Sequence, residues 1–323
     1  LRLSAAVGLA LLSVGCLYRG PQPFAVQDLH GTLAGVPLRD GDVVVNQAPN
    51  PTSMILSRHS PTPGRFSHAG VFVHAADGTP MVYHLRDGGG RAMKASNYFR
   101  RNELVGVYRH RRPDAAERLG PHIRQWLAEN DIGALPFVLF PDPDNFNSPP
   151  YNCNTFVNSF YLGAGMDPPF VQPASAPSTG WTREISRFVA SDWTRITSAS
   201  AVVGNPLFEE VVVWRNPLID PRLTAGMEGF TDAIRAEIEA GKRLKTQARH
   251  PPARLLAACF GDDDSEYATT QVLAIHFNLK DAWIRVQHRL LQVIRRDGDR
   301  FREEHAYELG RKMAQEHLDG LFE

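Results

Sequence analysis

The feature that most constrains the fold is a series of short β-branched segments in the first half of the chain. Each follows a turn or loop, and apolar residues alternate along them, as along the strands of a sheet. Asp77-Gly78-Thr79-Pro80 predicts a tight turn, so the segments on its two sides form a hairpin. Because hairpin strands are antiparallel, we expect an antiparallel sheet. The predicted strands are residues 43–45, 68–74, 81–85 and 104–109.

Helical periodicity dominates after these strands. Ile123, Trp126 and Leu127 share one face of a predicted helix over residues 113–130. Phe156, Phe160 and Tyr161 recur in the same way over residues 152–164. Further helices are predicted at 227–246, 269–296 and 301–321, with strands at 135–140 and 206–216 and an irregular linker at 168–181. Strands followed by helices predict an α+β protein.

The first residues are typical of an export signal. Residues 3–16 are apolar after Arg2, and the stretch is too short for a membrane span. It ends in Leu12-Ser13-Val14-Gly15-Cys16, which resembles a lipobox with its leucine one place early. We expect lipidation at Cys16 and a membrane-anchored lipoprotein of the cell envelope, facing the periplasm or the cell exterior. Cleaved soluble export and an uncleaved apolar anchor are the alternatives.

The predicted organisation follows from these segments. Residues 1–16 are the signal and lipobox, 17–37 a tether, 38–216 the catalytic domain and 217–323 a helical region. The 35 basic and 35 acidic residues cancel, so no electrostatic footprint for nucleic acid exists. The basic run 109–112 is interpreted as a solvated strand end, and Gly88-Gly89-Gly90 as a flexible rim. No cofactor is expected, and the oligomeric state stays open.

One cysteine has the surroundings of a nucleophile. The chain contains Cys16, Cys153 and Cys259, without the spacing of a zinc site. In an exported protein Cys153 and Cys259 either form a disulfide or serve separate purposes. Asn152 is a good N-cap, which places Cys153 at the first helical position. The helix dipole and the amides there favour a thiolate and can donate to an oxyanion.

A nucleophilic cysteine needs a base, and two histidines on the predicted hairpin are candidates. His68 begins a strand beside the small residues Ala69 and Gly70, which leave room for an imidazole to face a cleft. The return strand brings His84 toward His68, where it could orient the base, with His74 as a competitor. A histidine at a strand end can also be a purely structural residue.

The order of these motifs resembles a known family. Gly41-Asp42 opens a strand, Ser67-His68-Ala69-Gly70 and His84 follow on the next two, and Tyr151-Asn152-Cys153 begins a late helix. This order resembles the circularly permuted branch of the NlpC-type papain-like superfamily, the YiiX-like proteins. In unpermuted members the cysteine helix precedes the histidine strand. The resemblance covers roughly residues 38–170 and implies an antiparallel sheet packed on a cysteine-bearing helix. It says nothing about the last hundred residues, where helical periodicity alone predicts a C-terminal helical extension.

The resemblance also implies a catalytic triad and an activity. The triad residues are Cys153, His68 and His84, although permuted relatives often have Glu as the third member and Cys-Ser-Glu at the helix start. Members are hydrolases or acyltransferases, and several are lipoproteins. We expect a cysteine peptidase or amidohydrolase that cleaves an amide or peptide bond, with cell-wall peptide as one candidate substrate. The alternatives are an acyltransferase or a lipid or thioester hydrolase on the same triad, and a non-catalytic envelope-binding lipoprotein. Lecithin:retinol acyltransferase-like enzymes belong to the same superfamily.

Overall fold

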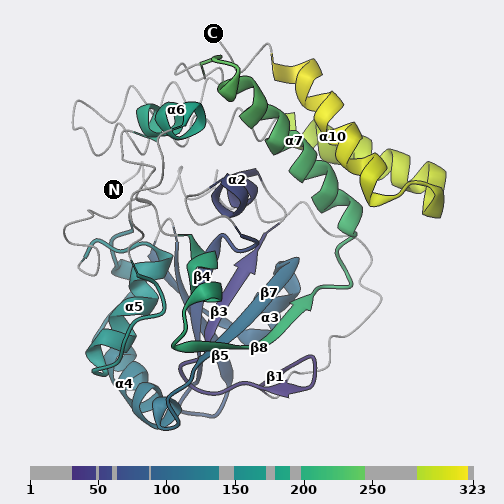
Figure 1. Ribbon diagram of the computed structural model, residues 1–323. Coiled ribbons are helices and arrows are strands. Elements are labelled where there is room, and N and C mark those ends of the chain that lie inside the picture. The colour runs from purple at the N-terminus through teal and green to yellow at the C-terminus, as the bar shows by residue number, and fades with distance from the viewer. Residues whose placement is uncertain are drawn as a thin grey trace, which may run out of the picture.

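The computed structural model describes residues 31–48, 51–59, 64–86, 89–137, 149–171, 179–189, 198–243 and 282–318. The protein is α+β, with an antiparallel sheet below a layer of helices (Figure 1). The predictions for the signal segment, for Cys16 and for Cys259 lie outside the described residues. Within the described residues no helix is long and apolar enough to cross a membrane.

The main sheet has six antiparallel strands in the order β6-β5-β4-β3-β7-β8. The strands predicted at 43–45, 68–74, 81–85, 104–109 and 206–216 are confirmed. Two further strands, β1 and β2, form a small hairpin in the predicted tether. The bounds are β1 Thr32–Leu33, β2 Val36–Pro37, β3 Val43–Gln47, β4 His68–His74, β5 Pro80–Arg86, β6 Gly89–Lys94, β7 Leu104–His110 and β8 Phe208–Arg215.

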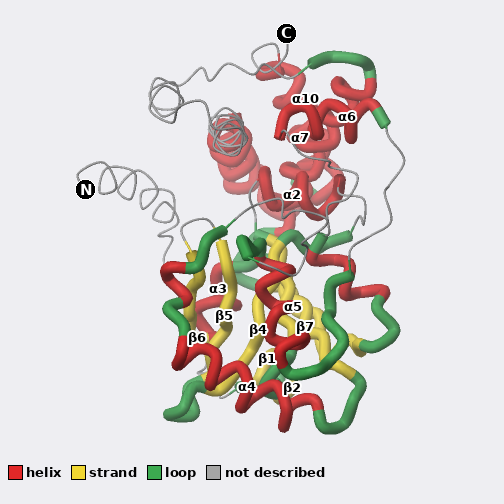
Figure 2. The backbone as a smooth tube through the Cα atoms, turned by 90° about the vertical axis from the view of Figure 1, so that its left-hand side faces the viewer, coloured by secondary structure: helices red, strands yellow, loops and turns green. Residues whose placement is uncertain are grey.

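Apolar alternation along the strands supplies a core on each face of the sheet. Ala69, Val71 and Val73 of β4 face the helices α4 (Ala115–Glu129) and α5 (Cys153–Gly163). Phe72 and its neighbours on the opposite face pack on α3 (Ala95–Arg101). The sheet is therefore covered on both sides, with α4 and α5 on one side and α3 on the other (Figure 2).

The helical layer has an apolar core of its own. It contains α2 (Pro51–His59), α6 (Gly180–Val189), α7 (Pro221–Glu239), a helix over residues 282–297, and α10 (Glu303–Leu318). Met54 of α2 and Trp181 of α6 are buried in the same cluster as Phe230 of α7. Short 3-10 turns complete the described structure: η1 (Ile132–Ala134), η4 (Ala199–Gly204) and η5 (Gly298–Arg300).

Two sequence predictions need correction. The strand predicted at 135–140 is absent from its described part, where η1 is followed by a single bridge between Phe137 and Tyr151. Gly89 and Gly90 belong to β6 and are buried, so they are no flexible rim. A Cβ atom on Gly90 would lie 2.6 Å from the carbonyl oxygen of Ile132, which shows that glycine is needed where η1 crosses the strand.

Candidate active site

Cys153 begins α5, as the Asn152 cap predicts. The Asn152 side chain accepts hydrogen bonds from the amides of Asn154 (3.0 Å) and Thr155 (2.9 Å). The Thr155 hydroxyl accepts in return from the Asn152 amide at 2.9 Å, which completes a capping box. The cap therefore fixes the start of the helix and holds Cys153 in its first turn.

The thiol of Cys153 lies against the first residues of β4. Helix α5 packs on β4 and β5, and the backbone amides of Ala69, Asn154 and Cys153 itself lie near enough to the sulfur to lower the pKa of the thiol. The β4–β5 ladder runs from His74↔Pro80 to Val71↔Tyr83. Ala69 lies two residues beyond this last pair, where its amide turns to the thiol. The sulfur therefore lies beside the part of β4 that no longer pairs with β5.

The two predicted histidines meet at the same end of the ladder. Nε2 of His68 lies 2.8 Å from Nδ1 of His84, and their rings are perpendicular with centroids 5.0 Å apart. His84 is 4 % exposed, and its Nε2 atom has no hydrogen-bond partner among the described residues. A buried polar atom without a partner costs free energy, so packing alone does not account for a histidine here.

Gly70 lets the two histidine strands approach. A Cβ atom at this position would lie 2.9 Å from the carbonyl oxygen of Tyr83 and 3.1 Å from Cβ of His84. Contacts this short would push β5 away from β4. The glycine in the Ser-His-x-Gly motif is therefore explained by the close approach of the backbone that carries His84.

A buried polar network behind His84 was not predicted from the sequence. The Tyr98 ring packs edge-on against His84 at 5.2 Å, and its hydroxyl donates to Oδ1 of Asn46. Nδ2 of Asn46 donates to Oδ1 of Asn102 (2.6 Å), and Nδ2 of Asn102 donates to the carbonyl of Tyr98 (2.8 Å). The closed network joins α3 to β3, beside the strand that begins with His68. It fixes the wall against which His84 rests.

The site is uncharged at neutral pH. Burial and, to a smaller extent, the positive charge of Arg86 together lower the pKa of His68 to about 4. Burial likewise holds the pKa of His84 well below its usual value. Burial raises the pKa of the Cys153 thiol to about 11, although the neighbouring amides act in the opposite direction. These shifts favour a neutral thiol and neutral imidazoles over a resting thiolate at pH 7.

The three residues gather at one end of the sheet, but the direct link between cysteine and base is absent. Within the described residues the Cys153 sulfur makes its side-chain hydrogen bond to Oδ1 of Asn154 (3.7 Å), and none joins it to His68. Strand alternation places His84 on the α3 face with Tyr98, whereas α5 covers the opposite face.

The competitor histidine, His74, belongs elsewhere. Its Nδ1 lies 2.7 Å from Oδ1 of Asp40, whose carboxylate also accepts from Arg124. His74 ends β4, whereas His68 begins it, so the whole strand separates the two. Of the two candidates, His84 is the partner of His68.

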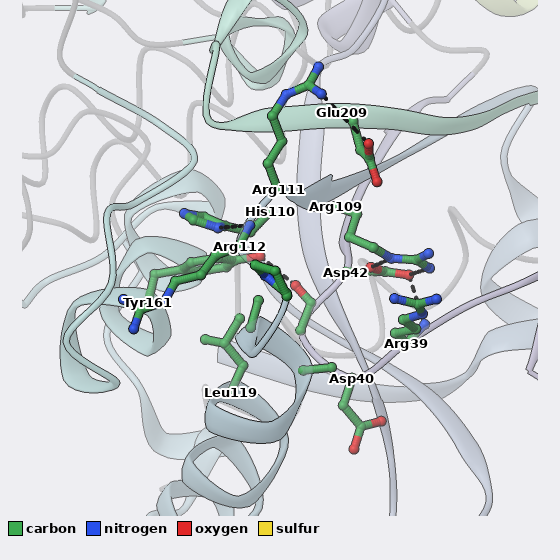
Figure 3. Close-up of a pocket in the computed structure, with 14 residues that line it drawn as sticks. Arg39, Asp40, Asp42, Arg109, His110, Arg111, Arg112, Leu119, Tyr161 and Glu209 are labelled. Atoms are coloured by element: carbon green, nitrogen blue, oxygen red, sulfur yellow. Dashed lines mark hydrogen bonds and ion pairs between the residues drawn. The ribbon is translucent and has the colours of Figure 1, made fainter.

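The basic run at the end of β7 lines a cavity of about 80 Å³ at the far end of α5, beside Tyr161 (Figure 3). Arg109 donates to both carboxylate oxygens of Asp42, at 2.8 and 2.7 Å, and Arg111 lies 3.7 Å from Glu209. Arg111 and Arg112 are exposed, as a solvated strand end predicts, whereas Arg109 is mostly buried. Because carboxylates match these arginines, the cavity is an ion-paired structural feature.

A second, open cleft of about 660 Å³ lies between α2 and α7. Arg58, Arg65 and Arg235 line it together with Asp232 and Glu239. None of Cys153, His68 and His84 lines either cavity. Among the described residues no group of three His, Cys, Asp or Glu side chains is arranged to hold a metal ion.

No protein-family model, curated protein or solved structure matches this chain. What the protein does must therefore be inferred from its own residues.

Proposed function

We propose that the protein is a thiol hydrolase of the circularly permuted papain-like type, exported and anchored through a lipid on Cys16, which cleaves an amide or peptide bond. The observation that carries the proposal is the 2.8 Å hydrogen bond between His68 and His84 beside the capped helix start that holds Cys153. The element order supports it, because the hairpin of β4 and β5 precedes α5 and α5 packs on that hairpin.

The neutral site favours general-base attack over a resting ion pair. The required tautomer of His68 donates from Nε2–H to Nδ1 of His84 and keeps a lone pair on Nδ1. The Cys153 sulfur attacks the substrate carbonyl carbon while its proton passes to Nδ1 of His68. The cap occupies the amides of Asn154 and Thr155, so the amides of Cys153 and Ala69 are the donors proposed for the oxyanion.

Two steps complete the reaction. When the tetrahedral intermediate collapses, the carbon–nitrogen bond breaks and the departing amine takes the proton from His68. The acyl group is then held as a thioester on Cys153. Water attacks the thioester carbonyl with His68 as base, the carbon–sulfur bond breaks, and the carboxylic acid leaves with the thiol restored.

A second candidate function has a specific observation in its favour. The neutral thiol, without a hydrogen bond to His68, also suits an envelope protein that uses this fold for binding. The two functions differ in whether Cys153 becomes acylated. An acyltransferase would share the first step and differ only in the acceptor of the acyl group.

The deciding experiment measures acylation of Cys153 by p-nitrophenyl acetate, an activated ester that needs no knowledge of the natural substrate. Release of p-nitrophenol is followed in the wild type, Cys153→Ala, His68→Gln and His288→Ala. His288 is exposed on the helix over residues 282–297 and serves as the histidine control. The glutamine variant retains hydrogen-bonding capacity but cannot act as a base.

Acylation is expected to disappear in Cys153→Ala and to fall by about 10²-fold or more in His68→Gln, the usual contribution of a general base. His288→Ala should match the wild type. Mass spectrometry of the quenched reaction should place the acetyl group on Cys153. Equal rates in His68→Gln and His288→Ala would refute the proposed function and favour the binding protein.

A further inference from the structure

The two edges of the main sheet differ in how they are covered. Strand β6 forms one edge, and η1 packs across it. Strand β8 forms the other edge and, among the described residues, pairs with β7 alone. An open edge presents unpaired backbone N–H and C=O groups, which are a template for pairing with another chain. β8 is therefore the edge to which a further strand can be added.

The second half of β8 is regular and apolar. A β-bulge interrupts the ladder at Val211, which lies between the residues that pair with Val107 and Tyr108. Beyond the bulge, residues 212–215 pair regularly with β7. The Val-Val-Val-Trp stretch over residues 211–214 contains neither the lysine nor the proline that protects many natural edge strands. This half of β8 is thus the segment suited to pairing.

Val213 is the exposed apolar side chain of this segment. It pairs with Gly106, where an added side chain would point into the core on the α5 side of the sheet. Because the glycine offers no side chain beside it, Val213 stays 40 % exposed. On the same side η4, whose Val202 belongs to that core, packs on β8 and leaves Val203 53 % exposed. Apolar surface therefore lies beside the open edge, where an added strand would cover it.

We propose that β8 pairs antiparallel with β8 of a second copy of this chain, so that two six-stranded sheets join into one. The inference does not depend on the proposed function. A two-fold axis at Val213 sets this residue opposite the partner's Val213, and Val212 opposite the partner's Trp214. Val212 and Trp214 both pack on the α3-side core, so every residue meets one from its own face of the sheet. A register shifted by one residue would oppose side chains from different faces.

The charges on β8 favour the antiparallel arrangement. Glu210 lies near the start of the strand and Arg215 at its end, and both are exposed on the α5 side. The Glu210 carboxylate accepts from the Tyr108 hydroxyl at 2.9 Å, and within the described residues Arg215 has only the more distant charges of Glu103 and Glu228 near it. Antiparallel pairing brings Arg215 next to the partner's Glu210 on both sides of the axis. Opposite charges on facing strands stabilise a sheet, whereas parallel, in-register pairing would set like charges against each other.

Sedimentation velocity of the full chain over a range of concentrations tests the pairing, with the dissociation constant of the dimer as the readout. Val213→Lys sets two lysines against each other on the axis. Leu162→Lys is the control, because Leu162 is 43 % exposed but belongs to α5. Arg215→Glu and Glu210→Arg are measured singly and together. All four side chains are exposed, so circular dichroism should show the wild-type fold in each variant.

We expect the wild type to sediment as a dimer that dissociates on dilution. Val213→Lys should raise the dissociation constant about tenfold or more, because a like-charge pair replaces an apolar one and each change occurs twice across the axis. Leu162→Lys should leave the constant unchanged. Arg215→Glu and Glu210→Arg should each raise it, and their combination should return it toward the wild-type value. Hydrogen exchange at the β8 amides should slow as the protein concentration rises.

Four results would each overturn the inference. The first is a wild type that stays monomeric at every concentration, and the second is an equal effect of Val213→Lys and Leu162→Lys. The third is a double charge variant that dimerises as weakly as the single ones. The fourth is protection of the β8 amides that does not depend on concentration, which would show that a segment of the same chain covers this edge.

Discussion

Gly70→Ala is the substitution that most directly tests how the histidine pair is held. The added Cβ would lie 2.9 Å from the carbonyl oxygen of Tyr83, 3.0 Å from Cγ1 of Val82 and 3.1 Å from Cβ of His84. The first of these is backbone and cannot rotate away. Strand β5 must therefore move from β4 by several tenths of an ångström, and His84 moves with it.

The expected magnitude follows from two opposing effects. Overpacking in a close-packed core costs about 1–3 kcal/mol. Replacing a strand glycine by alanine returns about 0.5–1 kcal/mol through the lower entropy of the unfolded chain. The net destabilisation is about 1–2 kcal/mol. Because the His68–His84 hydrogen bond must lengthen, acylation of Cys153 should fall about tenfold, less than the loss for a full 1 Å misplacement.

Urea denaturation gives the free energy of unfolding, and the p-nitrophenyl acetate assay gives the acylation rate. Gly204→Ala is the matched control, because no atom lies within 4 Å of the Cβ it would add. If Gly70→Ala proved as stable and as active as Gly204→Ala, the close approach of β4 and β5 would not be what positions His84.

Three more predictions concern packing, the polar network and pH. Gly310→Ala places a Cβ 1.8 Å from the carbonyl oxygen of Gly226, so α7 and α10 must separate. Urea denaturation should show that the free energy of unfolding falls by at least about 2 kcal/mol, and an unchanged midpoint would contradict the close contact between these helices. Tyr98→Phe removes the hydroxyl that donates to Asn46 and should lower the free energy of unfolding by about 1–3 kcal/mol. It should also shift the pH profile of Cys153 acylation, whereas a tyrosine with only a structural role would leave that profile unchanged. Since the folded pKa of His68 is about 4 against a usual 6.5, the unfolded chain binds more protons between these values, so His68 alone should lower stability by on the order of 3 kcal/mol as the pH drops from 6.5 to 4. His84, whose folded pKa is also lowered, adds to this fall. His68→Gln should therefore reduce the dependence without abolishing it, in denaturation series at pH 7 and pH 4.5.

The sheet and the cysteine helix could be predicted because their signals are local. β-branched alternation marks β3, β4 and β7, and the turn at 77–80 marks the hairpin that brings His68 and His84 together. Asn152 marks the start of α5 through its own side chain. In these places neighbouring residues alone determine the structure.

The parts that escaped prediction depend on contacts between distant segments. Helix α3 begins after Lys94, which makes no side-chain cap, so nothing in the sequence announces the helix that carries Tyr98. The bond between Tyr98 and Asn46 joins residues from different elements and has no local signature. The neutral state of Cys153 arises from burial by other elements, which the helix position could not reveal.

The shared core of the helical layer has a consequence for how the chain reaches its final state. Met54 is synthesised early, whereas its apolar partners in α7 and over residues 282–297 are synthesised much later. Until those helices are synthesised, α2 lacks their apolar cover, although Nε2 of Gln47 in β3 can donate to the Met54 sulfur as it does in the folded protein (2.9 Å). The carboxyl-terminal helices thus act as a closing element for the sheet half of the molecule. A chain truncated after β8 would expose Met54 and Trp181 to solvent as an apolar patch that favours aggregation.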